Sequence, residues 1–422
     1  MSGTNAIPVL FASCPKCKFE NTPRGKTHVL AMVCTSCNTY FTLGKWSDEE
    51  VTFLESHEPI IPVGQKGKIK GVTYEVSGFV IKRDKRYGSR WREYFLFNPK
   101  EGIAFLSEYN GHWNFIKPIS GNPKGDSVND SFQFDNHEYR LFQKYNADII
   151  YAKGEFFFDI FKLADRTLNY EYIAPPYLLG LEWSTSSLLW YKGEYISREE
   201  VATAFGVTSY SLPSQEGIGA TQPVIKAGFS DSALASVFGM LAGMVILLQV
   251  LFSNIAANRQ VIDQSFNKSD LPKEGEKLYV TRSFQLESTG SLEVKIKAPV
   301  DNDWFYADLV LVNEDTGEEY NFSKEVGYYH GYEDGSSWSE GNTVGEAFLS
   351  QIPHGNYHVV IYPEFSSSET FDFWIVQDVS MPSNMFLTLL GLVVFPVGFF
   401  IYKYNREKSR WSESDYSPYY TE

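Results

Sequence analysis

Four cysteines stand in two Cys-x-x-Cys pairs near the start of the chain, and their spacing predicts metal chemistry. The pairs are Cys14 with Cys17 and Cys34 with Cys37, and sixteen residues separate them. Each short pair lets two thiolates converge on one cation, and the loop between the pairs can bring them together into a tetrahedral site. We therefore predict one zinc ion held by all four sulfurs. Because no coordination position is left for water, the predicted zinc is structural and not catalytic.

Two other interpretations of the cysteines are a disulfide pair and a redox-active dithiol. A reducing cytoplasm disfavours the first, and no βαβ pattern supports the second. About forty residues can hardly bury a core, so metal binding would supply much of the folding free energy of residues 1–45. The spacing resembles a zinc ribbon, and ribbons bind nucleic acid in some proteins and other proteins in many more.

The acidity of the chain belongs to one segment. The whole chain has a net charge of −15, and residues 260–382 alone hold 22 acidic and 7 basic residues, so the remainder is neutral. Contact with phosphates needs a basic surface, so we expect no nucleic-acid partner. This segment also contains no cysteine, so no disulfide can stabilise it.

Two uncharged apolar stretches divide the chain, residues 233–255 and 385–402. About 20 apolar residues in a helix span the roughly 30 Å hydrocarbon core of a bilayer, so each stretch predicts a transmembrane helix. A buried core helix is the alternative for each stretch. The lipid bilayer is therefore the first predicted partner of this protein.

Basic residues predict the orientation in the membrane. Four of them closely follow the second apolar stretch: Lys403, Arg406, Lys408 and Arg410. Because such residues mark the cytoplasmic side, we predict cytoplasmic N- and C-termini and an extracytoplasmic segment 260–382. Residues 207–232 predict a flexible linker. The cytoplasmic tail, residues 403–422, is predicted to be disordered from residue 406.

The rest of the chain predicts a mainly β protein. Residues 64–206 alternate short strands with turns rich in Gly, Asn and Asp, with one helix near residues 197–205. We predict an antiparallel, barrel-like β-domain there, and a weak repeat that relates its halves would be explained by a duplication. Residues 260–382 also alternate, and their strands predict a β-sandwich of immunoglobulin-like or jelly-roll type.

The candidate binding residues of the β-domain are aromatic and polar. They are Trp91, Glu93, Tyr94, His112 and Trp113. Asn110 and Gly111 predict a tight hairpin turn before His112, which is either a ligand or base or a hairpin histidine packed by Trp113. Glu93 and Glu108 could form a carboxylate pair, although general acid–base catalysis also needs a cleft and split pKa values. We predict no catalytic residues.

The most distinctive stretch of the acidic segment is residues 328–341. Its candidate binding residues are His330, Glu333, Asp334, Trp338 and Glu340. Oxygen ligands with glycines suit calcium, and aromatic rings suit sugars. The alternative is a long hairpin whose aromatic side chains cover the sandwich.

Several motifs resemble the bacterial family known as domain of unknown function 4178. They run from Gly78 through Trp91-Arg-Glu-Tyr94 to Gly111-His112-Trp113, with further likeness at 172–176, 193–196, 204–206 and 328–341. The resemblance implies a bacterial inner-membrane protein, but it implies no activity, because none is established for the family. Family members often lie near genes for polyamine synthesis and envelope stress.

Together these features predict a two-span membrane scaffold, adaptor or sensor and not an enzyme. It would couple a cytoplasmic zinc ribbon and β-domain to an extracytoplasmic β-sandwich, with protein partners on both faces and a link to envelope stress or polyamines. The alternative is a membrane-anchored enzyme or small-molecule-binding protein that acts through the cytoplasmic β-domain.

Overall fold

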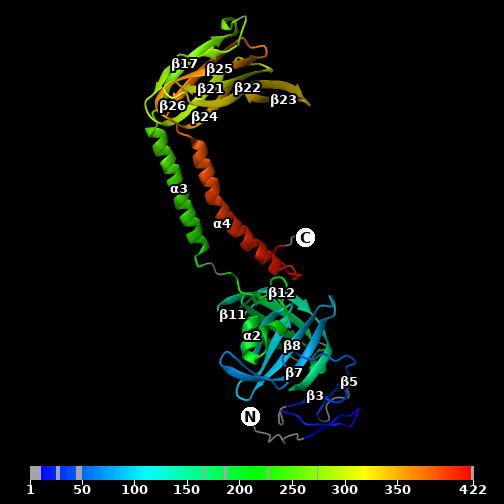
Figure 1. Ribbon diagram of the computed structural model, residues 1–422. Helices are drawn as coiled ribbons and strands as arrows, with labels where there is room; N and C mark the ends of the chain where they lie inside the picture. Colours follow the sequence, from blue (N-terminus) through cyan, green and yellow to red (C-terminus); the bar gives the residue numbers. More distant parts are fainter. Residues whose placement is uncertain are drawn as a thin grey trace. The chain divides into compact units, whose positions relative to one another are not determined.

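The computed structural model describes residues 11–24, 29–43, 50–164, 167–184, 188–225, 228–272 and 274–419. Parts of the predicted ribbon (1–10, 25–28, 44–45), linker (226–227) and tail (420–422) lie outside these residues. The chain divides into two compact units. The first unit comprises residues 1–228 and 399–422, and the second comprises residues 229–398 (Figure 1).

The four cysteines lie among five short strands. These are β1 (Ala12–Ser13), β2 (Glu20–Asn21), β3 (Ala31–Val33), β4 (Thr39–Thr42) and β5 (Val51–Thr52). β1 pairs only with β2, whereas β3, β4 and β5 extend the large sheet of the first unit through the pairing of β3 with β13 (Ala147–Phe156). Ala31, Val33 and Tyr40 belong to the main hydrophobic core of the unit. The cysteine strands are therefore part of the β-domain's sheet, whereas the sequence predicted a separate ribbon.

The remaining strands of the first unit form one antiparallel sheet. They are β6 (Lys66–Ile69), β7 (Val72–Asp84), β8 (Arg90–Asn98), β9 (Gly102–Tyr109), β10 (His112–Ile119), β11 (Phe132–Phe134), β12 (His137–Tyr145), β14 (Leu168–Ala174), β15 (Tyr177–Trp183) and β16 (Leu188–Ile196). The strand order is β12-β14-β15-β16-β10-β9-β8-β7-β13. Only Asn146 separates β12 from β13, so one continuous length of chain forms both ends of this path. The sheet therefore closes on itself and encloses an interior.

Local sequence explains the main turns and the helix of this unit. Asn110 and Gly111 have φ values of 49° and 76° and join β9 to β10, as predicted from the Asn-Gly pair. α2 (Arg198–Phe205) begins with a capping box between Ser197 and Glu200 and ends at Gly206 in the left-handed region. A shorter helix, α1 (Ile160–Ala164), follows β13.

Two segments that the sequence predicted to be flexible are packed against the first unit. Residues 207–222 include a 3-10 helix, η1 (Ser209–Ser211), and Leu212 and Thr221 are buried. In the tail, Arg410 and Trp411 are buried as well. The predictions of a flexible linker and a disordered tail are therefore wrong for these residues, because their side chains pack against residues that are far away in the sequence.

Two long helices lie in the positions of the predicted spans. α3 (Asp231–Ile255) and α4 (Pro382–Arg410) are long and apolar enough to cross a membrane. The two helices run side by side in the second unit, where the rings of Phe238 and Phe395 stack at 5.9 Å and Gln249 Nε2 donates to Ser380 Oγ at 2.7 Å. They form a helical hairpin whose connection is the rest of the second unit.

That connection contains two antiparallel sheets. The four-stranded sheet consists of β17 (Arg259–Asn267), β26 (Thr370–Gln377), β20 (Gly290–Lys297) and β24 (Val344–Ile352). The six-stranded sheet consists of β18 (Tyr279–Val280), β19 (Phe284–Leu286), β25 (Gly355–Phe365), β21 (Asp303–Asn313), β22 (Glu319–Glu333) and β23 (Ser336–Asn342). A second 3-10 helix, η2 (Lys268–Asp270), follows β17. Buried residues of both sheets, such as Val294, Phe373, Leu309 and Val359, form one hydrophobic cluster.

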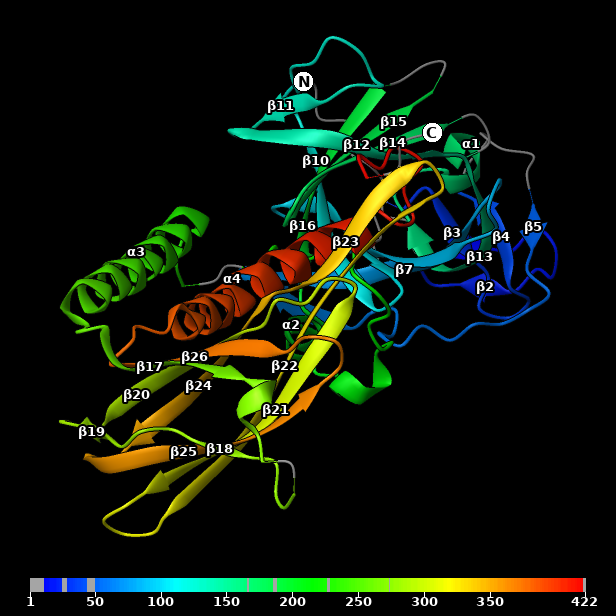
Figure 2. The ribbon, with the colours of Figure 1, turned by 90° about the horizontal axis from the view of Figure 1, so that it is seen from above.

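β22 and β23 form a long two-stranded ribbon, which both views show (Figures 1 and 2). Their turn is at Asp334 and Gly335, both with positive φ. Every residue of β23 is exposed. The stretch 328–341 is therefore a hairpin, in which Tyr328 packs against the core of the unit, whereas Tyr329, Tyr332 and Trp338 are exposed.

Candidate functional site

The first candidate site is the four-cysteine cluster. The four sulfur atoms lie within 4.8 Å of one another, with Cys14 and Cys37 at 3.6 Å and Cys17 and Cys34 at 3.7 Å. These distances are far longer than the roughly 2.05 Å of a disulfide bond, and all four thiols are free. Tetrahedral geometry with Zn–S bonds of about 2.3 Å places sulfurs about 3.8 Å apart. The cluster therefore has the spacing of a site that could bind a metal ion.

The two cysteine pairs have the same local architecture. The amide of Lys18 donates to the carbonyl of Cys14, and the amide of Asn38 donates to that of Cys34, at 2.9 and 3.0 Å. Lys18 and Asn38 both have positive φ. Each pair is thus a tight turn that points two sulfurs to one side. Burial raises the pKa of the Cys14 thiol to about 12, so a bound cation would be needed to hold all four sulfurs as thiolates.

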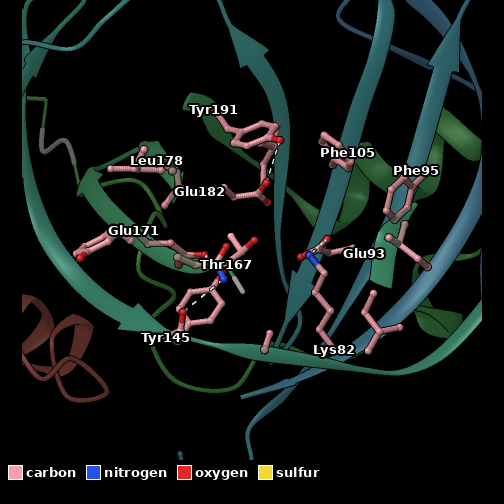
Figure 3. Close-up of a pocket in the computed structure, with 18 of the residues that line it drawn as sticks. Lys82, Glu93, Phe95, Phe105, Tyr145, Thr167, Glu171, Leu178, Glu182 and Tyr191 are labelled. Carbon is pink, nitrogen blue, oxygen red and sulfur yellow. Dashed lines mark hydrogen bonds and ion pairs between the residues drawn. The ribbon is translucent and has the colours of Figure 1, made fainter. Parts of the chain in front are cut away.

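The second candidate site is a cavity of about 120 Å³ inside the closed sheet. Side chains of β7 to β10 and β12 to β16 all line it. Rings of Phe95, Phe105, Tyr145, Phe158 and Tyr191 form much of its wall. Its charged residues are Lys82, Glu93, Glu171 and Glu182 (Figure 3). Charged groups on inward-facing positions are unusual for a structural core and mark a candidate binding site.

Lys82 and Glu93 form an ion pair on one wall of the cavity. Their Nζ and Oε atoms are 2.7 Å apart, and the side chains are 22 % and 15 % exposed. Trp91 Nε1 donates to the other Oε of Glu93 at 2.7 Å. Burial opposes the charge of Lys82, but the carboxylates of Glu93, Glu182 and Glu171 outweigh burial and raise its pKa. Lys82 is therefore firmly an ammonium ion.

Two further carboxylates occupy the neighbouring strands, where tyrosines hold them. Tyr145 donates to Glu171 at 2.8 Å, and Tyr191 donates to Glu182 at 3.1 Å. Gln143 adds a second bond to Glu171 at 2.7 Å. Burial raises the pKa of both glutamates, and in Glu171 these hydrogen bonds oppose the rise. The cavity thus contains two carboxyl groups that accept hydrogen bonds from neutral donors.

Of the candidate residues predicted in the β-domain, Glu93 lines the cavity. Trp91 does not line it, but its indole donates a hydrogen bond to Glu93. Tyr94 and Trp113 are fully buried and belong to the main hydrophobic core. His112 is also buried, and its Nε2 lies 3.1 Å from the carbonyl oxygen of Glu216. Burial lowers the pKa of His112. These three residues therefore contribute packing, and the interpretation of His112 as a hairpin histidine fits its surroundings.

Glu93 and Glu108 do not form a pair. Glu108 lies directly across from Arg92, its carboxylate is 2.6 Å from the Arg92 guanidinium, and it accepts the amide of Gly111. Because neighbouring strand residues point to opposite faces, Glu93 faces the cavity and Glu108 faces away from it.

The candidates in the outer hairpin are not gathered into one site. His330 bonds to Asp301 at 2.7 Å, and Trp338 lies over Gly331 on the other face of the ribbon. Among the described residues, the four cysteines are the only group of three or more His, Cys, Asp or Glu side chains placed to hold a metal ion. The prediction of a calcium site at Glu333, Asp334 and Glu340 therefore has no support from the geometry.

The sequence did not single out most of the cavity residues. The sequence patterns singled out none of Lys82, Tyr145, Glu171, Glu182 and Tyr191. Glu171 stands between two tyrosines that are buried on the opposite face, Tyr170 and Tyr172, so alternation alone places it on a solvent face. The closure of the sheet turns that face inward.

These features define a β-rich protein with a four-cysteine cluster, a charged internal cavity and two apolar helices. Residues 62–198 match the family model described as a domain of unknown function, DUF4178. The predicted resemblance is confirmed over these residues, while the motifs at 204–206 and 328–341 lie beyond the match.

No curated protein matches the chain. One solved structure, from work on carbohydrate-binding modules of the β-sandwich superfamily, covers 65% of this chain and 96% of its own length at 6% identity and a TM-score of 0.14. A likeness that low supports no statement about the fold or a ligand.

Proposed function

We propose that this chain is a two-span sensor of the bacterial inner membrane. Its cytoplasmic β-domain, with a structural zinc ion, binds a small molecule in the internal cavity. Helix α4 carries the effect of binding to an extracytoplasmic β-sandwich, which contacts other proteins. The attachment of the end of α4 to the cavity wall is the observation that supports this proposal best.

Arg410 and Trp411 make this attachment. Arg410 is 1 % exposed, and its Nη1 donates to the carbonyl oxygens of Gly219, Ala220 and Gln222 at 2.9, 3.1 and 2.6 Å. Trp411 belongs to a buried cluster with Phe142, Ile173 and Leu178, and Ile116 packs against that cluster. Leu178 and Ile116 also line the cavity. A change in the cavity wall would therefore reach the last turn of α4.

The helical hairpin supports the predicted orientation. The segments that precede α3 and follow α4 belong to the same compact unit, and the second unit connects the other ends of the helices. Two membrane crossings return the chain to its starting side, so both flanking segments would lie on the same side of the membrane. The basic residues after α4 favour the cytoplasm as that side.

Thiol labelling tests this topology. Asp334→Cys places a thiol in the β22–β23 turn, and Lys100→Cys places one in the exposed turn between β8 and β9. Labelling is read at the introduced cysteine by peptide mapping, because the four native thiols can also react. A membrane-impermeant maleimide on spheroplasts should label Asp334→Cys at that position and not Lys100→Cys, and lysis should make both introduced thiols reactive. Labelling of Lys100→Cys alone would reverse the proposed orientation, and labelling of both before lysis would contradict membrane crossing.

Hydrogen exchange tests the coupling without any ligand. In full-length protein in nanodiscs, Trp411→Ala should speed exchange in α4, in β15 of the cavity wall and in β17 and β26, which adjoin the helices. Tyr416→Ala is the matched control, because this tail residue is exposed and should change little. If the effect of Trp411→Ala ends within the first unit, the sensor proposal fails and the membrane helices are only an anchor.

The cavity favours a second candidate function, an anchored protein that binds its ligand without transmembrane coupling. The same exchange measurement separates the two, because an anchored binding protein has no reason to transmit a change to β17 and β26. We assign no catalytic role to the cavity residues.

A further inference from the structure

The charge of the internal cavity limits which ligand it can hold. Its four charged lining residues are three glutamates and one lysine. The ammonium of Lys82 already pairs with Glu93, and Glu171 and Glu182 accept hydrogen bonds from neutral tyrosines. With all groups ionised, the cavity therefore has an excess of two negative charges, so an anionic ligand would be repelled and a cation would be attracted.

The wall of the cavity suits an organic cation better than a metal ion. The carboxylates stand on three different strands, β8, β14 and β15. Within the described chain they are not placed close enough to act together as metal ligands. Aromatic rings make up much of the remaining wall, and such rings attract organic cations and cover their apolar parts.

Gly180 provides the room for such a ligand. It lies between Glu171 on β14 and Tyr191 on β16 in one row of directly paired residues. A Cβ atom at this position would meet only the Cβ of Tyr191, at 3.7 Å, which is an ordinary contact. A larger side chain there would extend into the cavity without a backbone clash. The missing side chain thus leaves open space beside the two tyrosine-held carboxylates.

We propose that the cavity binds a small organic ammonium ion, with its charged group at Glu171 and Glu182 and its apolar part against the aromatic wall. This inference rests on the proposed function and names the ligand class of the same site. The ammonium would donate hydrogen bonds to the two carboxylates, and Tyr145 and Tyr191 would hold those carboxylates in place.

Three probes of equal length and different charge test the proposal: butylammonium, 1-butanol and butyrate. Each is titrated by calorimetry into the full chain in nanodiscs of zwitterionic lipid, so that the lipid itself does not attract the cation. Butylammonium should bind saturably, and the neutral and anionic probes should bind at least about tenfold more weakly. Equal binding of all three, tighter binding of butyrate, or no binding of butylammonium would overturn the ligand class.

Matched variants locate the binding. Glu171→Gln and Glu182→Gln each remove one charge with little change in shape and should weaken butylammonium binding about tenfold or more. Glu138→Gln, on the exposed face of β12, is the control and should leave affinity unchanged. Gly180→Val should block binding by filling the space, which tests the site even if a glutamine variant folds poorly. Unchanged affinity in Gly180→Val would place the bound probe elsewhere and overturn the inference.

Failure of these titrations leaves the proposed function standing. Transmembrane coupling is judged by hydrogen exchange in Trp411→Ala, which involves no probe. Conversely, butylammonium can bind as expected while the exchange effect stops at the first unit, and then only the coupling fails.

Discussion

The two units of this protein are built from similar long antiparallel strands, but their interiors differ in chemistry. In the second unit, Phe373, Leu309 and similar side chains form one hydrophobic cluster, and buried polar groups such as Asn313 and Gln377 have hydrogen-bond partners. The first unit instead encloses a lysine and three glutamates in a cavity. An apolar interior contributes only stability, whereas enclosed charges cost stability and are retained where a protein binds or reacts.

The two units also differ in net charge. Residues 260–382 have a net charge of −15, equal to that of the whole chain, and the rest of the chain is neutral. The acidic residues of the second unit lie mostly at its surface, where a high net charge favours solubility, whereas three glutamates of the first unit line its cavity. Function is therefore expected from the inside of one unit and from the surface of the other.

Disruption of the four-cysteine cluster should produce the largest difference in stability between the two units. Cys14→Ser, or a strong chelator, should destabilise the first unit by several kcal/mol, because zinc in small structural sites contributes about 10–16 kcal/mol at pH 7. Since β3 pairs with β13, the loss should extend into the β-domain, while melting of the second unit stays unchanged. Differential scanning calorimetry of the full chain measures both transitions.

Ser36→Ala is the control for this experiment, because Ser36 is exposed within the second cysteine pair. The proposed insertion of α3 and α4 into the membrane should persist in Cys14→Ser. A loss of stability in the second unit of equal size would contradict the independence of the two interiors.

Loss of the hydrogen bonds that hold the C-terminal tail on the first unit should have an intermediate effect on stability. Arg410→Ala removes hydrogen bonds to three partly buried carbonyls, at a cost of about 1–3 kcal/mol. Amide exchange at residues 406–419 should then rise about 30-fold or more. Asn405→Ala, one turn earlier and exposed, should leave that exchange unchanged. Unaltered protection of the tail in Arg410→Ala would show that Trp411 alone holds it.

Removal of the two cavity carboxylates should have the smallest effect of the three changes, and it should alter the pH dependence of the stability of the first unit. Burial raises the folded-state pKa of Glu171 and Glu182, so their contribution to stability is fully present below the ordinary carboxyl pKa. It is lost as pH rises through the raised values. The double variant Glu171→Gln, Glu182→Gln should remove this loss and melt a few degrees higher at pH 7, since about 1 kcal/mol shifts Tm by roughly 2–4 °C.

Thermal melts of the first unit between pH 4 and pH 8 measure this effect. Glu138→Gln should leave the change of melting temperature with pH as it is in the wild type. If the double variant Glu171→Gln, Glu182→Gln also showed the wild-type change of melting temperature with pH, the cavity carboxylates would titrate as they do in the unfolded chain.

Much of the architecture was predictable because it depends on local sequence. The Cys-x-x-Cys spacing predicts the converging sulfurs, and uncharged runs predict α3 and α4. The Asn110–Gly111 turn and the Ser197 cap are likewise set by neighbouring residues. The order of the strands and the closure through β12 and β13 were not predictable, since they depend on pairings between residues far apart in sequence.

The sequence by itself determined the cysteine cluster, the two apolar helices and the alternating strands, because each follows from spacing within a few residues. Only the tertiary structure decided that Glu171 and Glu182 face an enclosed cavity. An alternating strand has two faces, and its sequence does not say which one a distant strand will cover. The burial of Arg410 and Trp411 was decided in the same way, because their partners lie about 190 to 270 residues earlier in the chain.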